Sequence, residues 1–206
     1  MKSFEQLIEV AEILNSPGGC PWDLIQTFQS LRPYILEEAH EALEAVDRNE
    51  DEEIIEELGD LLYTVIFYAM VAKREKRFSL ENILEALKAK LIRRHPHVFA
   101  DTKVDSVEDV IRTWDNVKKE EKKDRKSPFD GIPKALPSLQ RAHKILGRIK
   151  KHKVARKSLP ANTRSKELAS KIFEVVETAV EEEVDIESAF REMLTDLELE
   201  LQSTQS

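Results

Sequence analysis

The sequence predicts an all-α protein made of amphipathic helices. Apolar residues recur at three- and four-residue spacing over several segments, which is the repeat of a helix with one buried face. Of the 206 residues only 5 are glycine and 6% are aromatic, whereas 35% are charged. This composition argues against a β-protein with many turns and favours helices that keep one face in water.

The N-terminal part is expected to form a helix followed by an ordered loop. We predict a first helix from about residue 4 to residue 14, with Ser3 as its N-cap and a break at residues 15–19. Residues 20–23, Cys-Pro-Trp-Asp, then form a compact loop in which Cys20 is packed and Trp22 is the anchor.

Two antiparallel helices are predicted next. The first begins near Ser30, accepts Pro33 in its first turn and carries an apolar stripe as far as Val46. A short acidic connection at residues 49–51 leads to the second, whose stripe includes Leu58 and Ala69. Because the connection is so short, these two helices should pack against each other.

Two more helices complete this part of the chain. Ser79 is expected to start a helix that stops before Pro96, since the residue that precedes a proline disfavours helical backbone. Residues 95–103 are predicted to form a loop shaped by two histidines. Ser106 and Asp109 then form the capping pair of a fifth helix that runs through Val117.

A domain boundary is expected after the charge run at residues 118–126. The turn-rich segment 127–133 divides the chain into residues 1–126 and residues 127–206. Beyond it we predict a basic helix, a polar linker, acidic helices and a frayed tail. The ranges are 139–153 for the basic helix, about 165–201 for the acidic helices and 202–206 for the tail.

Charge and cysteine content limit the partners of the protein. A net charge of −8 argues against a general nucleic-acid binder, so no direct nucleic-acid contact is expected. The lone Cys20 cannot form an internal disulfide, and the N-terminus lacks the pattern of a signal peptide. The longest apolar run, residues 61–72, is too short for a bilayer. The sequence therefore predicts a soluble cytoplasmic protein without a membrane partner.

Two pairs of carboxylates lie on the predicted neighbouring helices. Glu38 and Glu41 are three residues apart on the first, and Glu57 and Asp60 are three apart on the second, so each pair shares one helix face beside the apolar stripe. Packing the two stripes together would gather all four. An all-oxygen cluster suits Mg²⁺ or Mn²⁺ better than zinc. Such a site fits phosphoanhydride hydrolysis, with Glu37 or Glu41 as candidates for orienting the attacking water.

Other interpretations of these carboxylates stay open. In so charged a chain, a single Glu-x-x-Glu is more often a solvated helix face. Glu37-x-x-His40 is the kind of motif used by ferritin-like di-iron proteins, but a second Glu-x-x-His is missing from a suitable helix. A non-catalytic helical scaffold or regulator, in which the acids are remnants, is the other alternative.

Four motifs in order resemble the MazG nucleoside triphosphate pyrophosphohydrolases. They are the Gly-Gly-Cys-Pro-Trp-Asp run at 18–23, Glu-Glu-x-x-Glu at 37–41, Glu-x-x-Asp at 57–60, and Lys-x-x-Arg-Arg-His-Pro-His-Val-Phe at 90–99. The resemblance covers roughly residues 1–140. It implies a fold of the four-helix type, an obligate homodimer, and hydrolysis of NTP or dNTP to the monophosphate and pyrophosphate.

The resemblance also implies roles for individual residues. The Mg²⁺ ligands would be Glu38, Glu41, Glu57 and Asp60, and Glu37 would hold or activate water. The substrate-binding residues would be Lys90, Arg93, Arg94, Trp114 and Lys118. On the sequence alone, the basic end of the fourth helix could merely complement the helix dipole, and a tryptophan on an apolar stripe could be a core residue.

The second half departs from tandem members of this family. Residues 130–137 resemble the segment that leads into a second copy of the fold. If Glu174 is aligned with Glu37, however, Val175 and Thr178 stand where two metal ligands would be needed. We therefore interpret residues 138–201 as a shortened, non-catalytic repeat that supports dimerisation or regulation.

Overall fold

All regular secondary structure described in the computed structural model is helical. The structure describes residues 2–121, 123, 125–155 and 162–203, and within these ranges it contains no strand. The predicted all-α class is therefore confirmed. Within the same ranges, no helix is both long and apolar enough to cross a membrane. The end of the predicted frayed tail, residues 204–206, lies outside the described residues.

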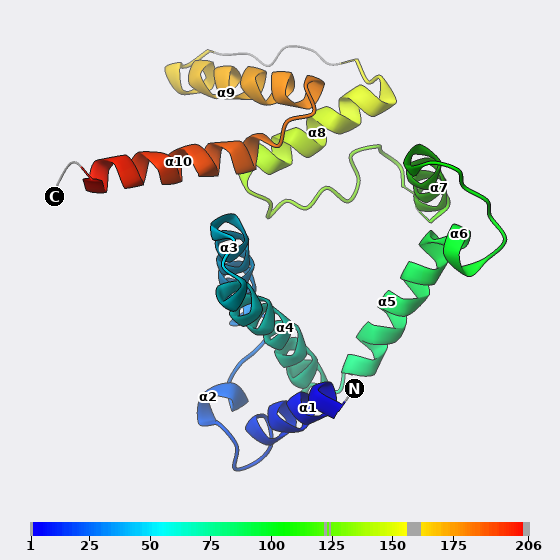
Figure 1. The fold of residues 1–206 in the computed structure, drawn as a ribbon, viewed down its shortest axis with the longest axis vertical. Helices are drawn as coiled ribbons and strands as arrows, with labels where there is room; N and C mark the ends of the chain where they lie inside the picture. The colour runs from blue at the N-terminus through cyan, green and yellow to red at the C-terminus, as the bar shows by residue number, and fades with distance from the viewer. Residues whose placement is uncertain (1, 122, 124, 156–161, 204–206) are drawn as a thin grey trace. The chain divides into compact units, whose positions relative to one another are not determined.

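The chain forms two compact units, residues 1–119 and residues 120–206 (Figure 1). The helices of the first unit are α1 (Lys2–Leu14), α2 (Pro21–Leu24), α3 (Arg32–Arg48), α4 (Asp51–Arg74), α5 (Leu80–Arg94), α6 (Pro96–Phe99) and α7 (Val107–Glu120). Those of the second are α8 (Ser138–His152), α9 (Arg164–Glu181) and α10 (Ile186–Ser203). That the first part is catalytic and the second a degenerate repeat stays a prediction.

Three local expectations were wrong. Helix α1 already includes Ser3, so this residue is not its N-cap. Residues 20–23 do not form a plain loop, because Pro21 starts the short helix α2, where its fixed φ suits the first turn. Pro96 likewise starts α6 inside the predicted 95–103 loop. Pro96 was expected only to end the helix before it, and no helix start was predicted at Pro21 or at Pro96.

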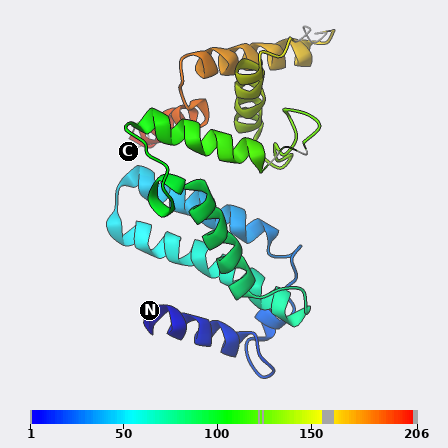
Figure 2. The ribbon, with the colours of Figure 1, turned by 90° about the vertical axis from the view of Figure 1, so that its right-hand side faces the viewer.

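Helices α3 and α4 form an antiparallel hairpin and share the most extensive packing in the first unit (Figures 1 and 2). Asn49 ends α3 in the left-handed region, with φ 59°, and its amide donates to the carbonyls of Ala45 and Val46. This αL cap turns the chain within two residues. The predicted antiparallel pair is confirmed, and so is the start of the next helix at Ser79, which is the N-cap of α5 and forms a full capping box with Asn82.

The apolar core of the first unit lies along the C-terminal half of α4. There, Ile66 and Met70 pack on Ala11 of α1, while Phe67 and Val71 pack on Leu31. The apolar stripes predicted to be buried on the two helices extend too far towards the turn between α3 and α4. Val46 and Leu58 belonged to them but are exposed, as are further large apolar residues of this half: Leu43, Ile55 and Leu62.

The second unit has a smaller core. Leu146 of α8 packs on Val176 and Val180 of α9, and the start of α10 contacts the same cluster through Ile186. Most of α10 contributes nothing to this core, since it has no buried residue. Its apolar side chains, from Phe190 to Leu201, are largely exposed.

The core predicts where the first unit is most sensitive to truncation. Replacing the fully buried Ile66 by alanine leaves a cavity between α1 and α4, and we expect it to lower the free energy of unfolding by about 2–5 kcal/mol. The exposed Ile13→Ala on α1 is the matched control, with an expected change within about 0.5 kcal/mol. Urea unfolding followed by circular dichroism measures both; equal losses would contradict this core.

Candidate active site

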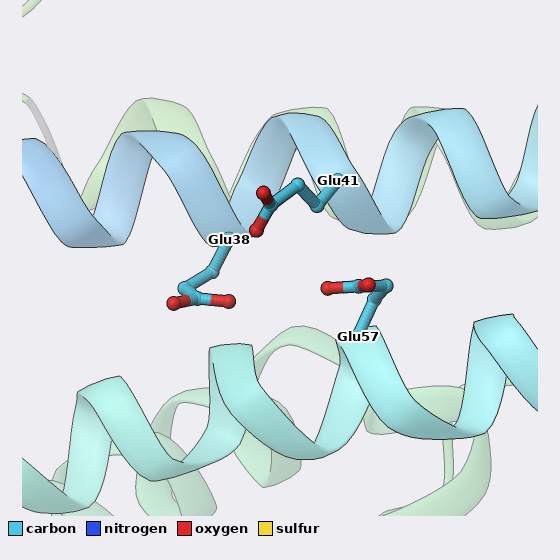
Figure 3. A group of neighbouring side chains, drawn as sticks. All are labelled: Glu38, Glu41 and Glu57. Carbon is cyan, nitrogen blue, oxygen red and sulfur yellow. The ribbon is translucent and has the colours of Figure 1, made fainter.

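Three carboxylates meet across the α3–α4 hairpin. Glu38 and Glu41 extend from α3 towards Glu57 on α4 (Figure 3). Each side chain offers an oxygen, and these three oxygens all lie within 4.8 Å of one another. Glu38 and Glu57 are half-buried, whereas Glu41 is exposed. The helix spacing that placed Glu38 and Glu41 on one face thus brings them opposite an acid of the neighbouring helix.

The carboxylates raise one another's affinity for protons. The pKa of Glu38 is raised above its ordinary value, first by partial burial and then by the negative charges of Asp60, Glu41 and Glu57. The pKa of Glu57 is raised in the same way, first by loss of solvation and then by Glu41 and Asp60. Every charged group among these causes is a carboxylate, so the site as it stands carries uncompensated negative charge.

The fourth predicted ligand lies beside this group. Asp60 is not one of the three carboxylates with oxygens within 4.8 Å of one another, yet its charge is the largest electrostatic contribution to the raised pKa of Glu38. Glu37 is exposed, and its charge acts on Glu38 more weakly than those of the other three acids. Adjacent residues on a helix do not face the same way. Glu37 is therefore at the rim of the group.

A shallow depression of about 290 Å³ continues from the carboxylates towards the turn between the helices. Its lining includes Glu41, Glu57 and Arg48, whose guanidinium forms ion pairs with Glu44 and Glu53. Arg48 was not predicted as a site residue, although its place seven residues after Glu41 puts it two turns further along the same face of α3. The depression is acidic, with one cation at its far end.

At the other end, the carboxylate row meets two exposed aromatic rings. Tyr34 is one turn before Glu38 on α3, and its ring centroid lies 5.6 Å from that of Trp22 in α2, at an interplanar angle of 82°. Tyr34 was not predicted as a site residue either, and its i, i+4 spacing to Glu38 was the available signal. Trp22 was expected to anchor its loop, but it is 46% exposed, whereas the neighbouring Asp23 is only 6% exposed.

The predicted substrate-binding residues form a second, basic group on α5 and α7. The ammonium of Lys118 lies 4.0 Å from the ring centroid of Trp114, and the guanidinium carbon of Arg94 lies 6.0 Å from it. Lys90 and Arg93 are exposed on the last turns of α5. In Figure 1, α5 runs away from α4 beyond their junction. The structure thus places Arg94 and Lys118 around Trp114 rather than among the carboxylates.

The donors fit a hard divalent cation. All the candidate ligands are carboxylates, two of them from one helix and one or two from the other. Loss of solvation, and then their mutual repulsion, raises the pKa values of Glu38 and Glu57. A cation of charge +2 would remove that repulsion, and oxygen donors are those that Mg²⁺ and Mn²⁺ prefer.

Comparisons with known proteins place the hairpin in a family. Residues 26–99 match the MazG nucleotide pyrophosphohydrolase domain, a range that contains α3, α4, α5 and α6. The chain is 44% identical over 148 residues to the nucleoside triphosphate pyrophosphohydrolase of Escherichia coli K12, covering 70% of this chain and 56% of that protein. It is 43% identical over 143 residues to the nucleoside triphosphate pyrophosphohydrolase/pyrophosphatase MazG of Thermotoga maritima, a match that covers 69% of this chain and 54% of that protein.

A solved structure is also similar to the chain. The mazG-related protein from Thermotoga maritima shares 32% sequence identity and matches 56% of this chain and 98% of its own, with a TM-score of 0.49. This chain spans about half the length of the two curated relatives. The matched domain, together with identities of 44% and 43% to the two curated relatives over about 70% of this chain, shows that the protein belongs to the MazG family.

Proposed function

We propose that the protein hydrolyses nucleoside triphosphates, NTP or dNTP, to the monophosphate and pyrophosphate with Mg²⁺. The observation that carries this proposal is the meeting of the Glu38, Glu41 and Glu57 carboxylates within 4.8 Å across the hairpin. Asp60, whose charge acts on Glu38, would complete the ligand set, and Mn²⁺ would substitute for Mg²⁺. The names of the relatives that share this region support the same reaction.

The chain's residues divide the work of hydrolysis. When bound, the cation polarises a phosphoryl oxygen and neutralises charge that develops there. Glu37, at the rim of the carboxylates, accepts a hydrogen bond from the attacking water and orients it. The triphosphate oxygens are bound by the basic group on α5 and α7, which consists of Lys90, Arg93, Arg94 and Lys118. Trp114 holds Arg94 and Lys118 in place through its ring.

We propose further that the active form is a cytoplasmic homodimer. None of α5, α6 and α7 has a buried residue, and α5 exposes Leu84, Leu87 and Leu91 at helical spacing. The N-terminal half of α4 exposes Ile55, Leu58 and Leu62. Large apolar surfaces of this kind are typical of protein interfaces. A second copy would cover them and bring its basic group to the carboxylates of the first.

The reaction itself is tested by product analysis. We expect the protein with Mg²⁺ to convert NTPs to monophosphate and pyrophosphate, and Glu38→Gln or EDTA to abolish turnover, because the carboxylate set then loses its cation. Phosphorus NMR resolves the products. Formation of diphosphate and orthophosphate would refute the proposed cleavage to monophosphate and pyrophosphate. No turnover of any NTP or dNTP would favour a non-catalytic scaffold.

Metal binding is tested separately by thermal unfolding. A ligand at a hundred times its Kd stabilises the folded state by about 2.7 kcal/mol, so Mg²⁺ should raise the Tm of the parent protein by several degrees. Glu38→Gln should lose this shift, yet be at least as stable as the parent without metal, because one of the repelling charges is gone. Lys88→Gln, exposed on α5, is the control that keeps the shift. An unchanged shift in Glu38→Gln would refute the ligand set.

The shared site of the dimer is tested by mixing two inactive variants. Glu38→Gln removes a carboxylate and Arg94→Ala a phosphate-binding cation. If each site uses both copies, unfolding and refolding the two variants together should restore about a quarter of the parental activity, since half of the dimers then hold one intact site. Mass analysis by light scattering confirms that dimers form. Mixed dimers without activity would refute a site shared in this way.

A further inference from the structure

We infer that the exposed Trp22–Tyr34 pair is the platform for the nucleotide base and that Arg74 is the residue that positions it. The inference rests on the proposed function and assigns to the aromatic rings the part of the substrate that the carboxylates and cations do not bind. It names residues outside the ligand set and outside the basic group on α5 and α7.

The pair lies in line with the carboxylates. Tyr34, Glu38 and Glu41 are spaced i, i+4 and i+7 on α3, so they share one helix face. Four residues of helix rise about 6 Å, which places Tyr34 one turn from Glu38. Trp22 packs edge to face on Tyr34 and contacts Phe67 of α4 with a ring-centroid distance of 6.1 Å. A molecule with phosphates at Glu38 can therefore extend along α3 to these rings.

The rings are held firmly although they are exposed. Trp22 is 46% and Tyr34 is 37% exposed. The backbone beside Trp22 is fastened to α4 by Arg74, whose guanidinium donates to the carbonyl of Asp23 at 3.3 Å and to that of Gln26. Gln26 donates in turn to the carbonyl of Trp22 at 3.0 Å. These three hydrogen bonds fix the backbone from Trp22 to Gln26.

Asp23 adds the last constraint on this loop. Its side chain is nearly buried and accepts a hydrogen bond from the Tyr63 hydroxyl of α4 at 3.4 Å. The loop is therefore anchored through Asp23 and Arg74, which leaves the Trp22 ring free to face solvent. A rigid, exposed aromatic surface is what a stacking ligand needs, because little side-chain entropy is lost when it binds.

Trp114 is a poorer platform for a base. The Lys118 ammonium occupies a position 4.0 Å from its ring centroid, and the Arg94 guanidinium also lies over it. Those cations suit phosphate, which is the charged end of the substrate. Trp22, in contrast, contacts the aromatic rings of Tyr34 and Phe67. The two tryptophans thus serve opposite ends of one amphipathic ligand.

The chemistry of the platform indicates the ligand class. Stacking uses the π-face that every base has, so it tolerates both purines and pyrimidines. The Trp22–Tyr34 pair therefore fits nucleoside triphosphates as a class, and a purine, with the larger ring, should bind more tightly than a pyrimidine.

Steady-state kinetics of the full chain test the platform. Stacking on an aromatic residue is worth about 1–3 kcal/mol per base, so Trp22→Ala should raise KM for NTPs by about 5- to 150-fold with little change in kcat. Trp22→Phe should retain most of the affinity. The matched control is Phe190→Ala in α10, which removes an aromatic ring that is 45% exposed and should leave KM unchanged.

Two inhibitors separate base binding from general damage. Trp22→Ala should weaken inhibition by the nucleoside monophosphate but not by inorganic tripolyphosphate, which has no base. Arg74→Ala should act in the same direction, and Arg74→Lys should partly restore the affinity. An unchanged KM in Trp22→Ala, or equal weakening of both inhibitors, would overturn the inference while the parent still turns over NTPs. A parent without turnover would instead refute the proposed function.

Discussion

The repulsion among carboxylates across the α3–α4 hairpin is the constraint on which the rest of the first unit depends. Glu38, Glu41 and Glu57 present oxygens within 4.8 Å of one another, and loss of solvation together with the neighbouring carboxylate charges raises the pKa of Glu38 and of Glu57. Such an arrangement opposes the packing of the two helices. The hairpin must therefore obtain its stability from residues elsewhere.

The sequence of α4 meets this requirement by separating function from packing along one helix. Its first half carries the acids and exposes Ile55 and Leu58, whereas its second half buries Ile66, Phe67 and Val71. Helix α1 and the loop around Leu31 pack on that second half. The αL cap at Asn49 closes the other end with backbone hydrogen bonds. The carboxylates therefore lie between the α3–α4 turn at one end and the apolar core of the C-terminal half of α4 at the other.

Helical periodicity predicted the hairpin and its carboxylates because both depend on local spacing. Glu38 and Glu41 share a face whatever the tertiary structure, and the short connection at residues 49–51 allowed only an antiparallel partner. The same reasoning placed Val46 and Leu58 in the core, where the structure exposes them. Periodicity identifies an apolar face but not whether this chain or a second copy covers it.

What the sequence could not predict is contact between distant segments. Arg74 donates hydrogen bonds to the carbonyls of Asp23 and Gln26, which are 51 and 48 residues before it in the sequence. Tyr34 becomes a candidate site residue only because these hydrogen bonds hold the loop so that Trp22 packs against the Tyr34 ring. No pattern within α3 or α4 encodes this contact. The proline starts of α2 and α6 were missed for a different reason, since a helix start at proline was considered only for Pro33.

Three chemically distinct surfaces follow from these constraints, and each suits one part of a nucleoside triphosphate. The carboxylates require a cation, the cations around Trp114 require an anion, and the Trp22–Tyr34 rings offer a flat apolar face. Glu38, Glu41 and the Tyr34 ring share one face of α3, but the basic group lies on α5 and α7, which have no buried residue in this chain. A metal-bound triphosphate would therefore bind most strongly where a second copy of the chain brings its basic group close to the carboxylates of the first. Assembly and substrate binding would then stabilise each other, because each supplies charges that the other lacks.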